Sequence, residues 1–405
     1  MSDPARRVAL YGLLGIGNIG NDASFETVLG WLRGEHPEVE VACITPVPDE
    51  MEARYGVRSV SLSRRPRTAS EGRGGRAKLL RRFLDIPHTW RLAGSYDAVI
   101  IPGMGVLEET LAVRPGGFPL SMFLMAAFCR LRGRRFILLD VGAEPVTRVT
   151  RRLFVATARL AAHLSYRDEW SAEAMRRAGG REPDALAPDL AFGHPVQVTV
   201  EREPGLLVVG VMAYHGWQDD PIRGAGVRSR YVTALADAVI RLIDSGDRIV
   251  LLGGDQVDHR VAHEVAATVR SARPDLEEDR IIVREVNTFS ELTAEMARAE
   301  AVVASRFHNL ICSLKLAVPT VSVGYATKNS RLMRDLGMAD SCQDIGELDP
   351  DRLVTQLTNV RRDAHEVTTS LRASADEYAT TVGALLHQVA VEVLQLPDQA
   401  WALNA

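Results

Sequence analysis

The residue types best suited to anion binding and proton transfer occur together in the stretch AVVASRFHNLICSLKLAVPT, residues 301–320. A strand is expected to end just before Ser305, which is a good helix N-cap residue. Arg306 and His308 then fall in the first helical turn, beside N–H groups that have no partner within the helix. A guanidinium and an imidazole at such a helix start favour binding of an anion. The alternative is that His308 is a structural histidine in a helix cap.

A second cation follows on the same rim. The helix after Ser305 is expected to end near Val318, because Pro319 disfavours helical backbone in the residue before it. The next strand, TVSVGY at 320–325, then places Lys328 in a loop. The carboxyl ends of parallel strands share one edge of a sheet, so Lys328 is expected near the Arg306 side chain.

A glycine-rich loop, GIGNIG at residues 15–20, has the G-x-G-x-x-G pattern between an apolar run and a helical one. Three interpretations compete: a dinucleotide site, a purely structural turn, and a loop that lines the site of another small substrate. A dinucleotide site needs an acidic residue at the end of the second strand, but that strand ends in Ile44-Thr45-Pro46. Asp22 is expected to cap the following helix, where it would compete with a phosphate for the same N–H groups.

Other strand ends carry weaker candidates. Gly103 and Gly105, in PGMG, let a ligand approach the backbone. Arg167 lies in SYRDEWS at a strand-to-helix junction; the alternative is that Asp168 only caps the helix and Arg167 only pairs with it. Further polar contributors are Asn18, Asp189, His215 and Asp255. No cluster has metal-ligand spacing, and the pair His259 and His263 fits a solvated helix face.

Short β-rich runs alternate with helical runs along the chain, which is typical of an α/β protein with parallel sheets. The strands are expected at 8–14, 39–45, 96–103, 134–142 and 163–167, and again at 205–213, 248–254, 280–286, 300–305 and 320–325. The proline-containing stretch 188–205 is expected to be an irregular crossover. The pattern therefore predicts two Rossmann-like domains that face each other across a cleft, 1–195 and 196–405. The last ~30 residues are helical and are expected to brace the two.

Composition excludes several classes of protein. A net charge of −4 does not favour binding to nucleic acid. The four cysteines lie far apart and are expected to be buried thiols in a reducing compartment. No apolar run approaches the length of a membrane span, so a cytoplasmic protein is expected. The basic segment 63–82 is either a solvated loop or a surface for anionic substrates or lipid head groups.

Taken together, GNIGNDA, the GMG turn, SYRDEWS, PDLAF and SRFHNLICSLKLAVPTVSVGYATK resemble the polysaccharide pyruvyl transferase family over roughly residues 8–340. The resemblance implies a glycosyltransferase B-like fold. It also implies transfer of a pyruvyl group from phosphoenolpyruvate to two hydroxyls of a saccharide, as a cyclic ketal, with phosphate released. No metal or organic cofactor is implied.

The family's donor-binding arginine and its essential histidine correspond to Arg306 and His308, and a further arginine corresponds to Arg167. With Lys328, these cations would hold the phosphate and carboxylate of the donor, and His308 would be the general acid. Donor binding is expected to favour the protonated imidazole. The acceptor side is assigned to the first domain, with the candidates Asn18, Asp22, Gly103, Gly105 and Asp189.

Two other functions share this architecture. One is a nucleotide-sugar-dependent glycosyltransferase, although the sequence contains no E-x-x-x-x-x-x-E segment of the kind that often holds a donor ribose. The other is a non-catalytic saccharide-binding protein. For a pyruvyl transferase, the acceptor is a saccharide or a lipid-linked saccharide. A lipid-linked acceptor would place the enzyme in peripheral contact with the inner face of a membrane. Homo-oligomerisation is left open.

Overall fold

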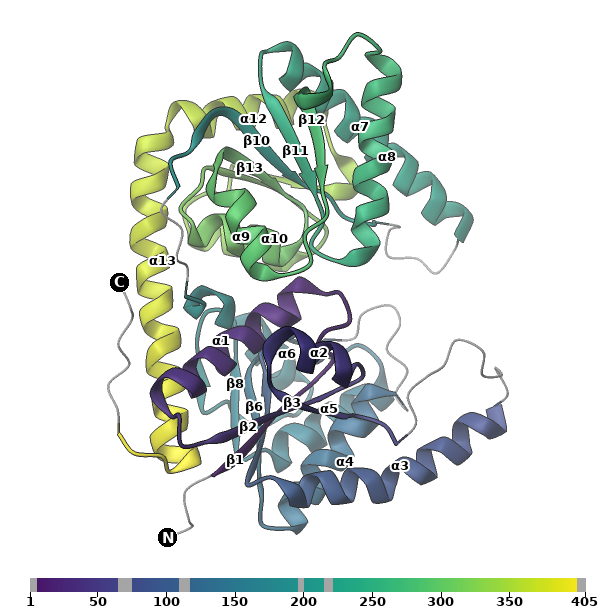
Figure 1. Cartoon of the computed structure of the whole chain (residues 1–405), viewed down its shortest axis with the longest axis vertical. Coiled ribbons are helices and arrows are strands. Elements are labelled where there is room, and N and C mark those ends of the chain that lie inside the picture. The colour runs from purple at the N-terminus through teal and green to yellow at the C-terminus, as the bar shows by residue number, and fades with distance from the viewer. Residues whose placement is uncertain (1–5, 65–74, 109–116, 196–199, 215–220, 399–405) are drawn as a thin grey trace. The chain divides into compact units, whose positions relative to one another are not determined.

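The structure is a computed structural model that describes residues 6–64, 75–108, 117–195, 200–214 and 221–398 (Figure 1). Within these ranges, the side chains of 75–84 and 221–225 are not described. Contacts divide the chain into two compact units. Unit 1 comprises 1–16, 21–195 and 378–405, and unit 2 comprises 17–20 and 196–377.

Unit 1 is built on a parallel sheet of seven strands in the order β3-β2-β1-β4-β6-β8-β9. Its central strands are continuous apolar runs, as expected for strands covered on both faces. The strand order reverses between β1 and β4, so the loops after these two strands diverge at a topological switch point. The strands are β1 Arg7–Tyr11, β2 Glu40–Thr45, β3 Arg58–Ser61, β4 Ala98–Pro102, β6 Arg135–Val141, β8 His163–Tyr166 and β9 Ala185–Leu186.

The crossovers of unit 1 are helical, and a two-stranded ribbon, β5 Leu107–Glu108 with β7 Ala143–Glu144, lies outside the main sheet. Helices α3, α4 and α5 pack next to one another. The helices are α1 Ile19–Glu35, α2 Pro48–Tyr55, α3 Gly75–Ser95, α4 Phe118–Leu131, α5 Arg148–Leu160, α6 Glu169–Arg177 and the 3-10 turn Leu190–Gly193.

Unit 2 repeats the architecture with a six-stranded parallel sheet in the order β12-β11-β10-β13-β14-β15. Here the order reverses between β10 and β13. The strands are β10 Glu203–Gly210, β11 Arg248–Leu252, β12 Ile281–Arg284, β13 Ala299–Ala304, β14 Thr320–Gly324 and β15 Cys342–Asp344. The helices are α7 Pro221–Asp244, α8 Gln256–Ala272, α9 Phe289–Ala297, α10 Phe307–Lys315, α11 Thr327–Asp335, α12 Pro350–Arg362 and α13 Ala364–Gln388, of which the part from Tyr378 on groups with unit 1. Short helical turns cover 278–280, 345–347 and 389–394.

The predicted fold class is confirmed: both units are Rossmann-like, and the ten expected strands are all present. Three short edge strands, β3, β9 and β15, were not predicted. The segment 63–82 is not one loop, because α3 begins at Gly75; residues 65–74 lie outside the described part of the chain. The stretch 188–205 is not wholly irregular either, since a 3-10 turn covers 190–193 and β10 begins at Glu203. Among the described residues, no helix combines the length and the apolar character that crossing a membrane requires.

Candidate functional site

The switch point of unit 2 carries Arg306. This residue lies two positions after the end of β13 and occupies the N-cap position of α10, so the prediction that Ser305 caps the helix was wrong. The Ser305 hydroxyl instead lies 3.2 Å from the hydroxyl of Tyr231 on α7. The helix also ends at Lys315, three residues before the predicted Val318. The first helical turn of α10 therefore begins one residue later than predicted, at Phe307. The N–H groups of this turn directly follow Arg306 in the chain.

Asp258 orients the Arg306 guanidinium. The Nε and Nη2 atoms of Arg306 donate to the two carboxylate oxygens of Asp258 at 2.8 and 2.7 Å. The same oxygens accept the backbone N–H groups of Ala213 and Gly254, at 2.7 and 3.1 Å. Asp258 is fully buried on α8. Through these hydrogen bonds it joins the loops that follow β10, β11 and β13. In the described part of the chain, Arg306 Nη1 makes no hydrogen bond, so this edge of the fork is available to a ligand.

His308 lies against the backbone of the glycine-rich loop. Residues Gly17–Gly20 belong to unit 2 by their contacts, and Asn18 pairs with Asp255 in an antiparallel bridge. The Ile19 N–H donates to the Gly254 carbonyl at 3.3 Å. A Cβ atom at position 20 would overlap the His308 imidazole ring. Glycine at this position therefore leaves the space that His308 occupies.

Lys328 and His308 flank the same aromatic ring. The Lys328 ammonium lies 5.1 Å from the ring centroid of Phe307 and 5.9 Å from that of Tyr325, within the range of cation–π attraction. The His308 ring meets Phe307 edge-on at 5.6 Å. Lys328 is in the first turn of α11 rather than in a loop, which corrects the prediction. The structure nevertheless brings Arg306, His308 and Lys328 to one place at the carboxyl ends of β13 and β14.

Sequence reasoning missed Asp258 and Asn309. Asn309 is fully buried on α10, where a Cβ atom at either Gly210 or Gly254 would overlap its amide. Its side-chain nitrogen and oxygen make no hydrogen bond with the described residues. The GG-D-x-x-D pattern at the end of β11 was the available signal for Asp258, whereas nothing in the sequence indicated Asn309.

Arg167, in unit 1, is the centre of a buried ion cluster. Its side chain is only 2% exposed, and it donates to Asp189 at 3.0 Å and to Glu108. Burial alone would lower the pKa of Arg167, but Glu108 and Asp189 outweigh it and raise the pKa above its usual range. Asp168 caps α6 by accepting the Ser171 N–H, in agreement with the alternative that this residue is a helix cap. The strongest contacts of Arg167 are thus internal to unit 1.

Asp140 completes this cluster at the end of β6. It is fully buried, and its backbone has the left-handed conformation with φ 58°, which is strained for a residue other than glycine. Burial and the neighbouring Asp189 raise the pKa of the Asp140 carboxyl well above its usual range, although Arg167 opposes them. Asp140 therefore lies next to the Arg167 ion pairs in a place where burial disfavours its charged form.

The remaining predicted acceptor contacts have identifiable structural partners. Asp22 does not cap α1; its Oδ1 accepts the Gly15 N–H at 2.8 Å and closes the glycine-rich loop. Gly103 faces Ser24 of α1, and Gly105 faces the Glu108 carboxylate, each so closely that a Cβ atom would overlap them. These glycines allow close packing within unit 1. His215 lies outside the described residues.

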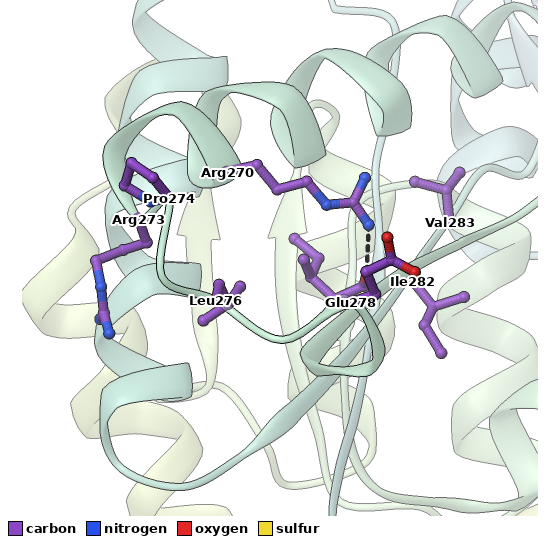
Figure 2. A pocket seen from close by; sticks show the side chains of 8 residues that line it. Arg270, Arg273, Pro274, Leu276, Glu278, Ile282 and Val283 are labelled. Atoms are coloured by element: carbon purple, nitrogen blue, oxygen red, sulfur yellow. Dashed lines mark hydrogen bonds between the residues drawn. The ribbon is translucent and has the colours of Figure 1, made fainter.

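No predicted site residue lines the surface hollow shown in Figure 2, which lies between the end of α8 and β12. Its Arg270 donates to the Ile281 carbonyl at 2.9 Å, and Arg273 pairs with Asp275. This hollow is at the amino ends of the strands, whereas ligands of such sheets bind at the carboxyl ends. Across the part of the chain that is described, no three His, Cys, Asp or Glu side chains gather as a metal site would require. His263 pairs with Glu285 instead.

The family model of polysaccharide pyruvyl transferases matches residues 18–327. The amylovoran biosynthesis protein AmsJ of Erwinia amylovora is 23% identical over 143 residues, which are 35% of this chain and 34% of that protein. The match thus spans about a third of the length of this curated relative.

Solved structures show the same fold at low identity. The UDP-GlcNAc 2-epimerase of Neisseria meningitidis bound to UDP-GlcNAc has a TM-score of 0.62 at 9% identity, covering 96% of this chain and 99% of that one. Anabaena Alr3699/HepE in complex with UDP has a TM-score of 0.56 at 12% identity, covering 96% and 100%. These similarities show a glycosyltransferase B-like fold of two Rossmann-like domains. Because the family match extends over most of the chain, from the glycine-rich loop to the start of α11, this protein belongs to the polysaccharide pyruvyl transferase family.

Proposed function

We propose that this protein transfers the pyruvyl group of phosphoenolpyruvate to two hydroxyls of a saccharide, forming a cyclic ketal and releasing phosphate. Its family makes it a polysaccharide-modifying transferase; the donor and the ketal chemistry are the proposal. One observation carries it. The imidazole of His308 and the ammonium of Lys328 flank Phe307 at the start of α10. The guanidinium of the preceding residue, Arg306, is held by Asp258 at the same carboxyl edge of the sheet.

Donor binding follows from these charges. Phosphoenolpyruvate carries a phosphate and a carboxylate, and both are good acceptors for charge-assisted hydrogen bonds. Arg306 would use Nη1, because Asp258 occupies the other edge of its fork. Lys328 would supply a second, mobile cation. The N–H groups in the first turn of α10 add a partial positive charge to the same place.

The proposed reaction begins when His308 gives a proton to the methylene carbon of the donor, as general acid. The central carbon then gains oxocarbenium character, and a first saccharide hydroxyl forms a C–O bond to it. The bond to phosphate breaks next, and a second hydroxyl closes the ring. Of the two hydroxyl protons released, one restores the imidazolium and one leaves with phosphate. The scheme needs no metal and no organic cofactor.

The acceptor side of the proposal is coarser. A saccharide acceptor fits the family, and the candidate contacts Asn18, Asp22, Gly103, Gly105 and Asp189 stay predictions. Arg167 also stays a prediction as a donor contact, since its described partners are carboxylates of unit 1. We assign no general base, because Asp22 and Asp189 already accept hydrogen bonds from Gly15 and Arg167.

Thermal unfolding with millimolar phosphoenolpyruvate, UDP, UDP-sugars or NAD tests the donor. A ligand at about 100 times its dissociation constant adds about 2.7 kcal/mol of stability. We expect a shift with phosphoenolpyruvate, lost in Arg306→Ala and kept in Arg260→Ala, an exposed arginine of α8. A shift with UDP or a UDP-sugar instead would identify a glycosyltransferase and remove the proposal.

Phosphate release with saccharide acceptors tests the chemistry. His308→Gln should abolish turnover and keep the thermal shift with phosphoenolpyruvate, since the change removes the acid and leaves both cations. Full activity in this variant would rule out His308 as the general acid.

A further inference from the structure

The outward stripe of α4 is apolar. On this helix the buried face is formed by Met122, Met125, Ala126 and Cys129. The opposite stripe, at helical spacing, is Leu120, Leu124, Ala127 and Leu131. The first three side chains are partly exposed, and Leu131 is 73% exposed. A helix on the surface of a water-exposed domain normally carries polar residues at these positions.

The neighbouring helices extend this apolar surface. Trp90 of α3 is 40% exposed and meets Phe128 of α4 edge-on at 5.2 Å. Ile86 lies one turn before Trp90 and is also exposed. On α5, which packs on α4, Val149 is 56% exposed. The helices α3, α4 and α5 are neighbours (Figure 1). All three carry exposed aliphatic or indole side chains.

The same three helices are rich in exposed arginine. Residues 117–160 contain eight arginines and two acidic residues, of which Asp140 is buried. Six arginines of the three helices and their ends are exposed and form no ion pair with any described residue: Arg91, Arg130, Arg132, Arg148, Arg151 and Arg152. The Arg132 guanidinium lies 4.9 Å from the ring centroid of Trp90. The surface is therefore strongly cationic as well as apolar.

We propose that this surface, formed by α3, α4 and α5, binds the interface of a lipid bilayer with anionic head groups. Aliphatic side chains and a tryptophan between unpaired arginines match the two layers of such an interface. Each arginine near an anionic membrane contributes electrostatic attraction, and the apolar stripe of α4 enters the boundary with the acyl chains. A second copy of the chain fits less well, because pairing two such surfaces would oppose like charges. The proposal does not depend on the proposed function of unit 2.

Co-sedimentation of the full chain with vesicles tests the surface. The chain should bind vesicles of phosphatidylglycerol and phosphatidylcholine, and bind phosphatidylcholine vesicles much more weakly. Arg148→Glu with Arg152→Glu should weaken binding at least twentyfold, since each arginine lost is worth about fivefold near such a surface. Leu131→Glu should weaken it about tenfold, because an exposed leucine loses its apolar insertion.

Matched controls separate these effects from folding and from net charge. Val200→Glu and Arg260→Glu make single changes of the same kinds, apolar to glutamate and arginine to glutamate, at exposed positions of unit 2, and both should bind vesicles like the wild type. Thermal unfolding of every variant should match the wild type. Absence of vesicle binding, equal binding to both lipid compositions, or equal loss in the controls would overturn the proposal. So would a dimer in sedimentation equilibrium that Leu131→Glu dissociates, since a second copy would then cover α4.

Discussion

Replacing Asp258 by asparagine is the sharpest test of how the anion site is held together. The two oxygens of this buried carboxylate each accept one N–H of Arg306 and one backbone N–H, from Ala213 or Gly254. An amide keeps one oxygen, and its NH₂ group then faces two donors whichever way it is oriented. The arginine also loses its counter-charge, although it is only 19% exposed.

The expected cost is about 3–5 kcal/mol, the range for breaking a buried ion pair from one side. A typical domain has a free energy of unfolding of about 5–15 kcal/mol, so unit 2 should still fold. The loops after β10, β11 and β13 lose their common partner. Because Arg306 then has no fixed orientation, the thermal shift with phosphoenolpyruvate should shrink with the stability.

Hydrogen exchange of the β11 and β13 amides measures the loss of unfolding free energy within unit 2. A melting temperature of the whole chain would combine the unfolding of both units. Asp255→Asn is the matched control. Asp255 caps α8 by accepting the Val257 N–H, a bond that asparagine can keep, so its cost should be small. A double-mutant cycle with Arg306→Met should give a coupling of about 2 kcal/mol. A cost for Asp258→Asn below about 1 kcal/mol, or a coupling near zero, would refute the reasoning.

Three further predictions concern other positions. Gly20→Ala should reduce turnover about a hundredfold, because the added methyl group displaces the His308 imidazole by an ångström or more. Burial raises the pKa of Asp22 to about 6, so its contribution to stability is fully present below pH ~4 and is lost as the pH rises through about 6. Between pH 4 and pH 7, the free energy of unfolding should fall by about 3 kcal/mol less in Asp22→Asn than in the wild type, as measured by urea unfolding at the two pH values. Arg167→Met should destabilise unit 1 by about 3–5 kcal/mol in chemical unfolding, because Glu108 and Asp189 lose their shared counter-charge.

Each of these has a control within the chain. Gly30 is in the same helix as Gly20 and has nothing within 4 Å of an added Cβ, so Gly30→Ala should leave turnover unchanged. Equal effects of the two glycine changes would contradict the account of His308. A pH slope that persists in Asp22→Asn would assign it to another group. Arg177 pairs only at the surface, and Arg177→Met should cost less than about 1 kcal/mol.

Much of the fold was predictable because its signals are local. Apolar runs and helical periodicity located ten strands and the helices between them. The edge strands β3, β9 and β15 were missed because they are only two to four residues long, and β3 and β15 contain polar residues as well. Cap positions were also wrong: Asp22 and Ser305 have typical cap side chains, but tertiary partners, Gly15 and Tyr231, bind them instead.

The sequence by itself determined that Arg306, His308 and Lys328 would share one edge of a sheet, because parallel strands end together and each residue lies within four positions of a strand end. Only the tertiary structure decided what each side chain does there. Asp258 precedes its partner Arg306 by 48 residues, and Arg167 is joined to Glu108 across 59. Residues 17–20 of the glycine-rich loop also group with unit 2, where Gly20 lies against His308. Such contacts depend on how helices pack on a sheet, and no local pattern of residues encodes that packing.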